Sequence, residues 1–62
     1  MFSHSETYNG IKATVHFFHK SIFLEDLEAG NWTQFSLSEY EKFNGNMQDF
    51  INENKWQINL KG

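Results

Sequence analysis

The 62-residue sequence contains no cysteine and no arginine. Without cysteine the chain has neither disulfide bonds nor thiolate metal ligands, which is typical of proteins from a reducing compartment. The five basic residues are all lysines and stand against eight acidic residues, so the net charge is −3. Nucleic-acid-binding domains usually show the opposite balance, with an arginine-rich basic patch. We therefore expect no direct binding of nucleic acid.

Long apolar segments are also missing. No stretch approaches the ~20 apolar residues of a membrane span. The first ten residues, MFSHSETYNG, lack the charged leader and the apolar run of a signal peptide. We expect a cytoplasmic protein without membrane contact.

Motifs for catalysis, cofactors and metals are absent from the sequence as well. There is no glycine-rich phosphate loop and no G-x-S-x-G elbow. His16 and His19 are three residues apart, and on a strand an odd separation directs side chains to opposite faces, so we expect no shared metal ion. A chain this short has little room for a substrate pocket of ~300 Å³ or more. We expect neither an enzyme nor a cofactor or metal site.

Aromatic residues, in contrast, are abundant. Seven Phe, two Trp and two Tyr make up 18% of the chain. A domain of this size hides only ~60% of the surface that its unfolded chain exposes, and each buried ring accounts for ~150–250 Å². Some rings are therefore expected at an interface, where aromatic residues are enriched. We expect one domain over residues 1–62 that forms a homodimer.

The hydrophobic pattern predicts two strands before the middle of the chain. Residues 1–8 are expected to be flexible, and Asn9-Gly10 is a turn signal. Residues 11–18 then alternate, with Ile11, Ala13, Val15 and Phe17 on one face. Residues 22–28, IFLEDLE, form a second strand that is apolar on both sides, which suggests that a subunit interface covers its second face.

One main helix and a third strand are predicted after Gly30. Ser36 and Glu39 have the spacing of a capping box. Gly45 can take the left-handed conformation that ends the helix after Asn44, and Asn46 can cap a further turn or two with Met47, Phe50 and Ile51. The last strand has inward side chains at Trp56, Ile58 and Leu60. The predicted fold is α+β, a three-stranded antiparallel sheet with one main helix in the order strand, strand, helix, strand.

Tyr40 and Glu41 on this helix have two interpretations. They are either a half-buried aromatic beside a solvated charge, as on most amphipathic helices, or a pair that contacts a partner. A tyrosine with a carboxylate at its side is a common composition of binding hot spots. Helical periodicity alone does not decide between the two.

Residues 35–51, FSLSEYEKFNGNMQDFI, resemble the helical segment of the small uracil-DNA glycosylase inhibitors made by tailed phages of Bacillus. The shared features are Ser-Leu-Ser at 36–38, an acid at 39, an aromatic at 40, Glu41, an apolar residue at 43, Gly-Asn at 45–46, and Asp49. The specific part covers about fifteen residues. Length, acidity, absence of cysteine and the predicted element order extend the resemblance loosely over the chain.

The resemblance implies a dimeric mimic of DNA that acts in the cytoplasm of the bacterial host. In that family two protomers join their sheets and set their helices side by side. Acidic groups take phosphate positions, and a pocket between the helices holds the apolar side chain that the glycosylase inserts into DNA. The family's second helix tyrosine falls on Asn44, and Phe18, Phe23 or Trp32 is a candidate to replace it. The expected contacts are Leu37, Glu39, Tyr40, Glu41, Asn44 and Asp49, with Glu25 and Asp26 as further phosphate stand-ins.

Two alternatives stay open at the level of sequence. The chain could be a small dimeric adaptor or inhibitor of another DNA-processing host protein. It could also bind single-stranded nucleic acid by stacking bases on sheet aromatics such as Phe18 or Phe23. The absence of arginine and the negative net charge argue against the second alternative.

Overall fold

The computed structural model of the chain describes residues 3–61, with side chains as far as Ile58. Its fold is α+β, with four strands followed by three short helices. The strands are β1 (Ser3–Tyr8), β2 (Ile11–His16), β3 (Ser21–Asp26) and β4 (Trp32–Ser36). The helices are α1 (Leu37–Glu41), α2 (Met47–Asn54) and α3 (Trp56–Lys61).

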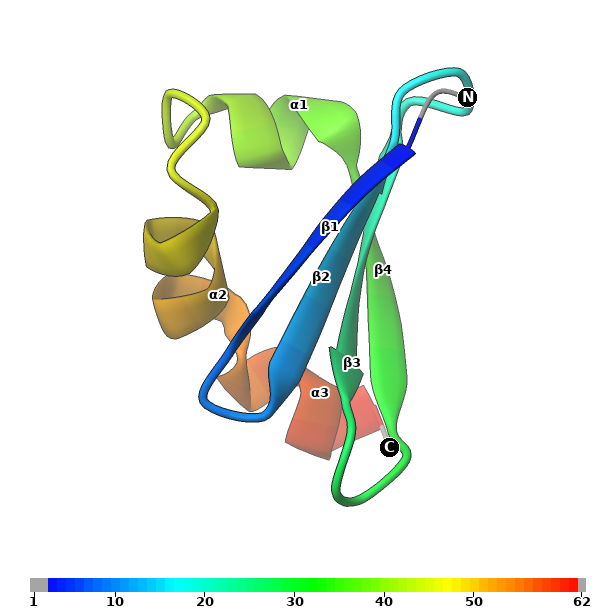
Figure 1. The fold of residues 1–62 in the computed structure, drawn as a ribbon, viewed down its shortest axis with the longest axis vertical. Coiled ribbons are helices and arrows are strands. Elements are labelled where there is room, and N and C mark those ends of the chain that lie inside the picture. The colour runs from blue at the N-terminus through cyan, green and yellow to red at the C-terminus, as the bar shows by residue number, and fades with distance from the viewer. Residues whose placement is uncertain (1–2, 62) are drawn as a thin grey trace.

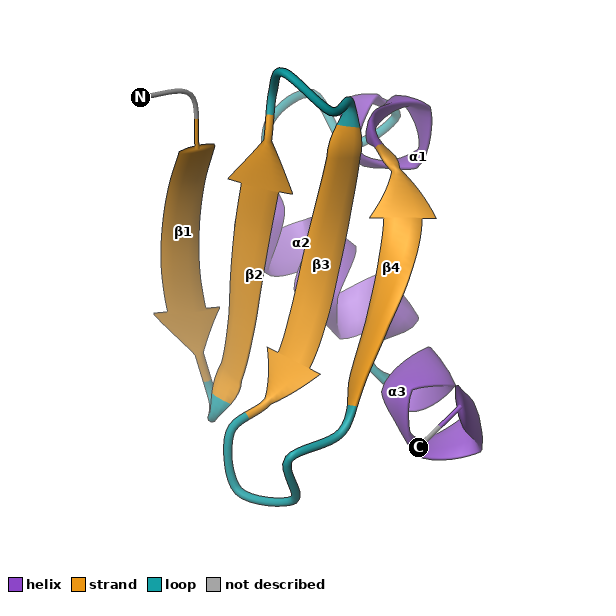
Figure 2. Ribbon diagram, turned by 90° about the vertical axis from the view of Figure 1, so that its right-hand side faces the viewer, coloured by secondary structure: helices purple, strands orange, loops and turns teal. Residues whose placement is uncertain are grey.

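The four strands form one antiparallel sheet in the order β1-β2-β3-β4, so each strand pairs with its neighbours in the sequence (Figure 2). Asn9 and Gly10 both have positive φ, 53° and 81°, and join β1 to β2 in a two-residue hairpin. Asn-Gly is the sequence that this type of hairpin favours. The predicted turn is confirmed.

All three helices lie on one side of the sheet, and the opposite side is not covered by any described element (Figures 1 and 2). The core lies between the sheet and the helices. Its buried apolar side chains are Ile11, Ala13, Val15, Ile22, Leu24, Met47, Phe50, Ile51 and Ile58. The ring of Phe50 is contacted edge-on by three other rings, those of Phe35, Tyr40 and Phe43, at centroid distances of 5.3, 5.6 and 5.5 Å.

The predicted three-stranded sheet is wrong, because two more segments form strands. Ser3–Tyr8, expected to be flexible, pairs with β2 over its whole length. Polar side chains on both of its faces hide the period-two signal of a strand. Trp32–Ser36, expected to lead into the helix, is strand β4, in which Thr33 is buried and Trp32 and Gln34 are exposed.

The predicted last strand is wrong as well, because residues 56–61 form helix α3. Ile58 points into the core as expected, but Trp56 is exposed. The inward placement predicted for Leu60 lies outside the side chains that the structure describes. Two side-chain hydrogen bonds tie α3 to the end of α2, from Trp56 Nε1 to the Glu53 carbonyl at 2.9 Å and from Gln57 Nε2 to Asn54 Oδ1 at 3.0 Å. Five alternating residues contain too few periods to separate a strand from a short helix.

The predicted main helix is shorter than expected. α1 ends at Glu41, three residues before the predicted end, and residues 42–45 form a turn in which Asn44 and Gly45 have positive φ. Ser36 occupies the N-cap position, but its hydroxyl interacts with Ser38 Oγ at 2.9 Å and does not cap the helix. Asn46 does cap α2, because its Oδ1 accepts a hydrogen bond from the Asp49 amide at 3.0 Å.

Candidate partner-binding surfaces

Tyr40 is half-buried, and its hydroxyl is used within the chain. The hydroxyl donates a hydrogen bond to the Gly45 carbonyl oxygen at 3.0 Å, and the ring packs edge-on against Phe50. Burial raises the pKa of the Tyr40 hydroxyl above its ordinary value, and the Glu6 carboxylate nearby adds to this. The ring therefore anchors α1 and the following turn to the core.

Glu41, the next residue, faces a different environment. Together with Leu37 it lines a hollow of about 390 Å³ between α1 and the turn that joins β2 to β3. Phe17 and Lys20 form the side of this hollow that belongs to the turn, and Ser36 and Ser38 complete it. The Leu37 amide donates a hydrogen bond to the Lys20 carbonyl at 2.8 Å, which fixes α1 against the turn. We call this space the α1 hollow.

The other predicted contact residues do not line the α1 hollow. Glu39 is exposed and forms an ion pair with Lys42 at 3.5 Å. Asn44 is exposed in the turn after α1. Asp49 is exposed in the first turn of α2. The structure thus brings Leu37 and Glu41 together and places Tyr40, Glu39, Asn44 and Asp49 elsewhere.

The aromatic residue beside Leu37 and Glu41 is Phe17, which the sequence did not suggest for this role. Its side chain is 50% exposed. Phe23 and Trp32, which were considered as replacements for the family's second tyrosine, belong to the uncovered face of the sheet. The alternation on β2 predicts Phe17 on the core face, but the strand ends at His16 and leaves Phe17 in the turn.

The two remaining acids considered as phosphate stand-ins differ in their surroundings. The Asp26 Oδ1 atom accepts hydrogen bonds from the Glu28 and Ala29 amides at 3.0 and 3.1 Å. It therefore shapes the loop between β3 and β4. Glu25 is exposed and lies opposite Lys12 on β2 and Trp32 on β4.

A second surface is the uncovered face of the sheet. Phe23 lies on this face between His16 and Trp32, with ring centroids at 5.3 and 5.7 Å. The ring of His19 lies 6.5 Å from His16, although we expected the two histidines on opposite sides, because His19 belongs to the turn after the strand. Among the described residues no group of three or more His, Cys, Asp or Glu side chains could hold a metal ion.

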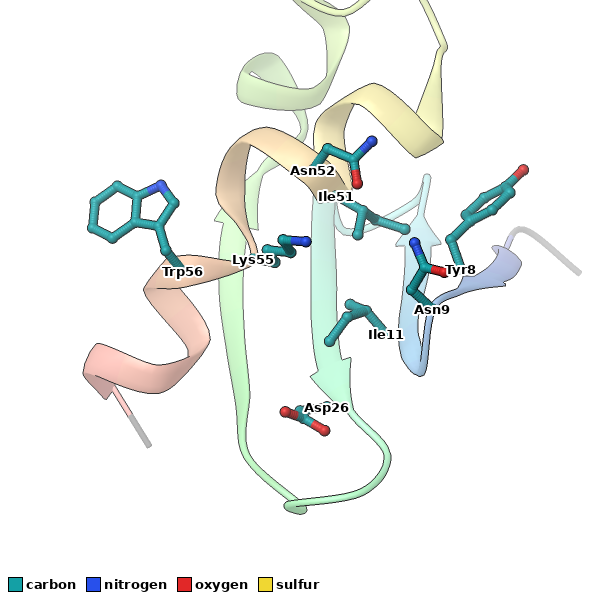
Figure 3. A pocket seen from close by; sticks show the side chains of 8 residues that line it. All are labelled: Tyr8, Asn9, Ile11, Asp26, Ile51, Asn52, Lys55 and Trp56. Atoms are coloured by element: carbon teal, nitrogen blue, oxygen red, sulfur yellow. The ribbon is translucent and has the colours of Figure 1, made fainter.

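A further cavity, of about 310 Å³, lies beside the hairpin that joins β1 to β2 and the end of α2 (Figure 3). Ile11 and Ile51 form its apolar floor, and the side chains of Asn9, Asn52 and Lys55 point towards it. Its volume is at the lower end of the ~300–1,000 Å³ typical of ligand pockets, so the expectation that a chain this short has little room for a hollow of this size is wrong. Trp56, which also borders it, points outwards (Figure 3).

Tyr8, at the edge of the same cavity, belongs to a hydrogen-bonded group on β1. The Tyr8 hydroxyl donates to the Glu6 carboxylate, which also lies 2.7 Å from His4 Nε2. The hydrogen bond from Tyr8 lowers the pKa of Glu6, with a smaller contribution from His4, and the same bond raises the pKa of Tyr8. The group links alternate residues of the edge strand, and its Tyr8 ring is partly buried against the core.

Comparisons with known proteins leave the function to be inferred from these surfaces. No helix within the described residues is long and apolar enough to cross a membrane. No protein family, no curated protein and no solved structure matches the chain.

Proposed function

We propose that the protein acts by contact, as an inhibitor of the uracil-DNA glycosylase of a bacterial host, and has no catalytic activity of its own. The observation that carries this proposal is the α1 hollow. It joins an apolar wall, Phe17 and Leu37, to the exposed carboxylate of Glu41 on the helix whose sequence resembles the phage inhibitors.

The chemistry of the target suits such a surface. A glycosylase extrudes its base from the DNA stack, and proteins that distort DNA in this way insert an apolar side chain between bases and follow the backbone with basic groups. An apolar hollow beside a carboxylate is complementary to both features. Burial of the inserted side chain against Phe17 and Leu37 would contribute about 1.5–3 kcal/mol.

The carboxylates contribute in a different way. Glu39, Glu41 and Asp49 are exposed on α1 and α2, where they take the place of phosphates along the basic groove of the enzyme. Charges of this kind mainly accelerate association and are screened by salt. The complex is therefore expected to weaken as salt is raised but to persist, because the apolar contact is much less sensitive to salt.

The resemblance also implied a pocket between the helices of two protomers. In the present proposal each chain carries its own hollow, since α1 and the turn at residues 17–20 build it within one chain. A dimer would then carry two such hollows. The site of action remains the cytoplasm of the host cell.

Displacement of DNA from the glycosylase tests the proposal. Equimolar protein is expected to release a fluorescent single-stranded oligonucleotide from the enzyme, and Phe17→Ser is expected to weaken the release. Leu27→Ser is the matched control, because Leu27 also lies in a turn and is 51% exposed, against 50% for Phe17. If the protein leaves the oligonucleotide bound, or if both variants act alike, the proposed site is wrong.

Two other functions remain to be separated from this one. An inhibitor of another DNA-processing protein would use the same hollow but leave the glycosylase active. A binder of single-stranded nucleic acid is favoured by the aromatic rings on the uncovered face, which offer a stacking surface. The net charge of −3 and the lack of arginine argue against it. A gel shift with labelled single-stranded DNA at moderate salt would support it.

A further inference from the structure

The cavity of about 310 Å³ beside the β1–β2 hairpin is built from three separate parts of the chain (Figure 3). Asn9 and Ile11 come from the hairpin, and Asp26 comes from the end of β3. Asn52 and Lys55 come from the last turn of α2 and its C-cap. We call this space the hairpin cavity. It shares no lining residue with the α1 hollow and is therefore a separate site.

Backbone hydrogen bonds and core packing hold the walls of the hairpin cavity in place. The Leu27 amide donates to the Gly10 carbonyl at 3.0 Å, which joins the loop after β3 to the hairpin. On the opposite wall the Lys55 amide donates to the Ile51 carbonyl at 2.8 Å. The two isoleucines of the floor, Ile11 and Ile51, belong to the buried core. The cavity is thus largely formed before a ligand arrives, as in most small-molecule sites.

Two opposite charges border the hairpin cavity without neutralising each other. They are the Asp26 carboxylate and the Lys55 ammonium group, and neither forms an ion pair with a described residue. In Figure 3 they lie on opposite sides of Ile11. The Asp26 Oδ1 atom accepts the Glu28 and Ala29 amides, at 3.0 and 3.1 Å. A carboxylate has a second oxygen and further lone pairs, so Asp26 can still accept hydrogen bonds from a ligand.

The other groups of the hairpin cavity restrict the class of ligand. The side-chain amides of Asn9 and Asn52 point towards it, and each can both donate and accept a hydrogen bond. Ile11 and Ile51 offer apolar surface between the polar groups. An anion or a cation would satisfy only one of the two charges, and an apolar ligand would leave both uncompensated. A ligand that carries both charges and an apolar group matches the whole cavity.

We propose that the hairpin cavity binds a small zwitterion with an apolar side chain, either a free amino acid or a dipeptide. Its ammonium group pairs with Asp26, its carboxylate pairs with Lys55, and its side chain lies on Ile11 and Ile51. Hydrogen bonds between charged groups are stronger than neutral ones, so the two charges contribute most of the selectivity. The amino acid and the dipeptide carry the same groups and differ in the distance between their charges.

Titration of the full, isotope-labelled chain with leucine, followed by NMR, tests the proposal. We expect saturable shifts of the Asn9, Gly10 and Asn52 amides, with a dissociation constant of about 1 mM for a ligand of about ten non-hydrogen atoms. Isocaproate lacks the amine of leucine and isopentylamine lacks its carboxylate. Each should bind at least ~10-fold more weakly than leucine. Glycyl-leucine is titrated in parallel, and the tighter of the two zwitterions identifies the natural ligand as an amino acid or a dipeptide.

Substitutions that each remove one charge test the roles of the two residues. Lys55→Gln should raise the dissociation constant of the better zwitterion at least ~10-fold. Asp26→Asn should do the same, since it keeps the Oδ1 acceptor of the loop after β3 and removes only the charge. Lys42→Gln is the matched control, because Lys42 is the exposed C-cap of α1 as Lys55 is of α2, but does not line the cavity. It should leave the constant unchanged.

Three results would overturn the proposal. They are the absence of saturable shifts up to about 10 mM of either zwitterion, equal binding of leucine and both singly charged analogues, or equal affinity of the Lys55→Gln and Lys42→Gln variants. Circular dichroism checks the fold of each variant. Should Asp26→Asn fail to fold, Lys55→Gln decides, because this side chain is exposed at the end of α2. The outcome does not depend on the proposed function, since the α1 hollow is a different site.

Discussion

The Tyr40 hydroxyl donates a hydrogen bond to the carbonyl oxygen of Gly45, five residues further along the chain, at 3.0 Å. The backbone between them reverses through Asn44 and Gly45, whose φ angles are 55° and 79°. The bond closes the turn between α1 and α2. Of the two neighbouring residues that the sequence proposed as partner contacts, Tyr40 thus supports the fold, while Glu41 faces the α1 hollow.

Replacing Tyr40 by Phe separates these roles. Loss of one hydrogen bond is expected to lower the free energy of unfolding by about 1 kcal/mol. Inhibition of the glycosylase should not change, because the ring still packs against Phe50. Urea denaturation and an inhibition assay measure the two quantities. A variant that folds with full stability but does not inhibit would instead place the hydroxyl at the partner.

Replacing Glu41 by Gln is expected to have the opposite result. The carboxylate is exposed, so stability should stay within about 0.5 kcal/mol of the wild type. Inhibition should weaken about threefold to tenfold at low salt, mainly through slower association. Glu53→Gln removes the same charge from an exposed position on α2 that has no role in the proposed contact, and serves as control. Equal effects of the two variants would mean that only the net charge matters.

Replacing Gly45 by Ala tests the turn that Tyr40 closes. A Cβ atom at this position would meet no other atom within 4 Å, so the cost arises from the positive φ alone. We expect the free energy of unfolding to fall by about 1–2 kcal/mol. Asn52→Ala, an exposed position on α2, should change it by less than about 0.5 kcal/mol. Chemical denaturation checks both, and an unchanged stability of Gly45→Ala would show that the turn is not as described.

The hydrogen-bonded side chains of His4, Glu6 and Tyr8 on β1 predict that the stability of the fold depends on pH. The Tyr8 hydroxyl and His4 lower the pKa of Glu6 from its ordinary value of 4.5. Ionised Glu6 therefore stabilises the fold above this pH, and its contribution is lost as the pH falls through the lowered pKa. In Tyr8→Phe the pKa of Glu6 should rise, and the thermal midpoint should decline less steeply below pH 4.5. NMR titration of the Glu6 carboxyl measures the pKa, and an unchanged value would refute the role of Tyr8.

Much of the fold follows from local sequence signals. The alternation in residues 11–16 places Ile11, Ala13 and Val15 in the core, and Asn9-Gly10 forms the expected turn. The signal for β1 was present but indirect, because a two-residue Asn-Gly hairpin implies a strand on each side. The segment from Trp56 is different. Its alternating pattern fits a strand, but the sheet is already built from the four preceding segments, and a helix places Ile58 in the core.

The candidate site was predictable only in part. The resemblance gave Leu37, Tyr40, Glu41 and Asn44 as contacts together, and of these only Leu37 and Glu41 line the α1 hollow. Phe17 could not be placed from the sequence, because its position depends on where β2 ends and how the turn at residues 17–20 folds back towards α1. The apolar residues on both sides of β3 indicated that neither face of this strand is purely polar, and Phe23 lies between the rings of His16 and Trp32 on the uncovered face of the sheet.

Release of uracil from DNA by a bacterial glycosylase, measured with and without this protein, is the most direct test of the proposed function. With an equimolar amount of the protein, we expect uracil release from both single- and double-stranded substrates to stop, and to recover when Phe17→Ser replaces the wild type. Undiminished uracil release in the presence of the folded wild-type protein would contradict the proposal.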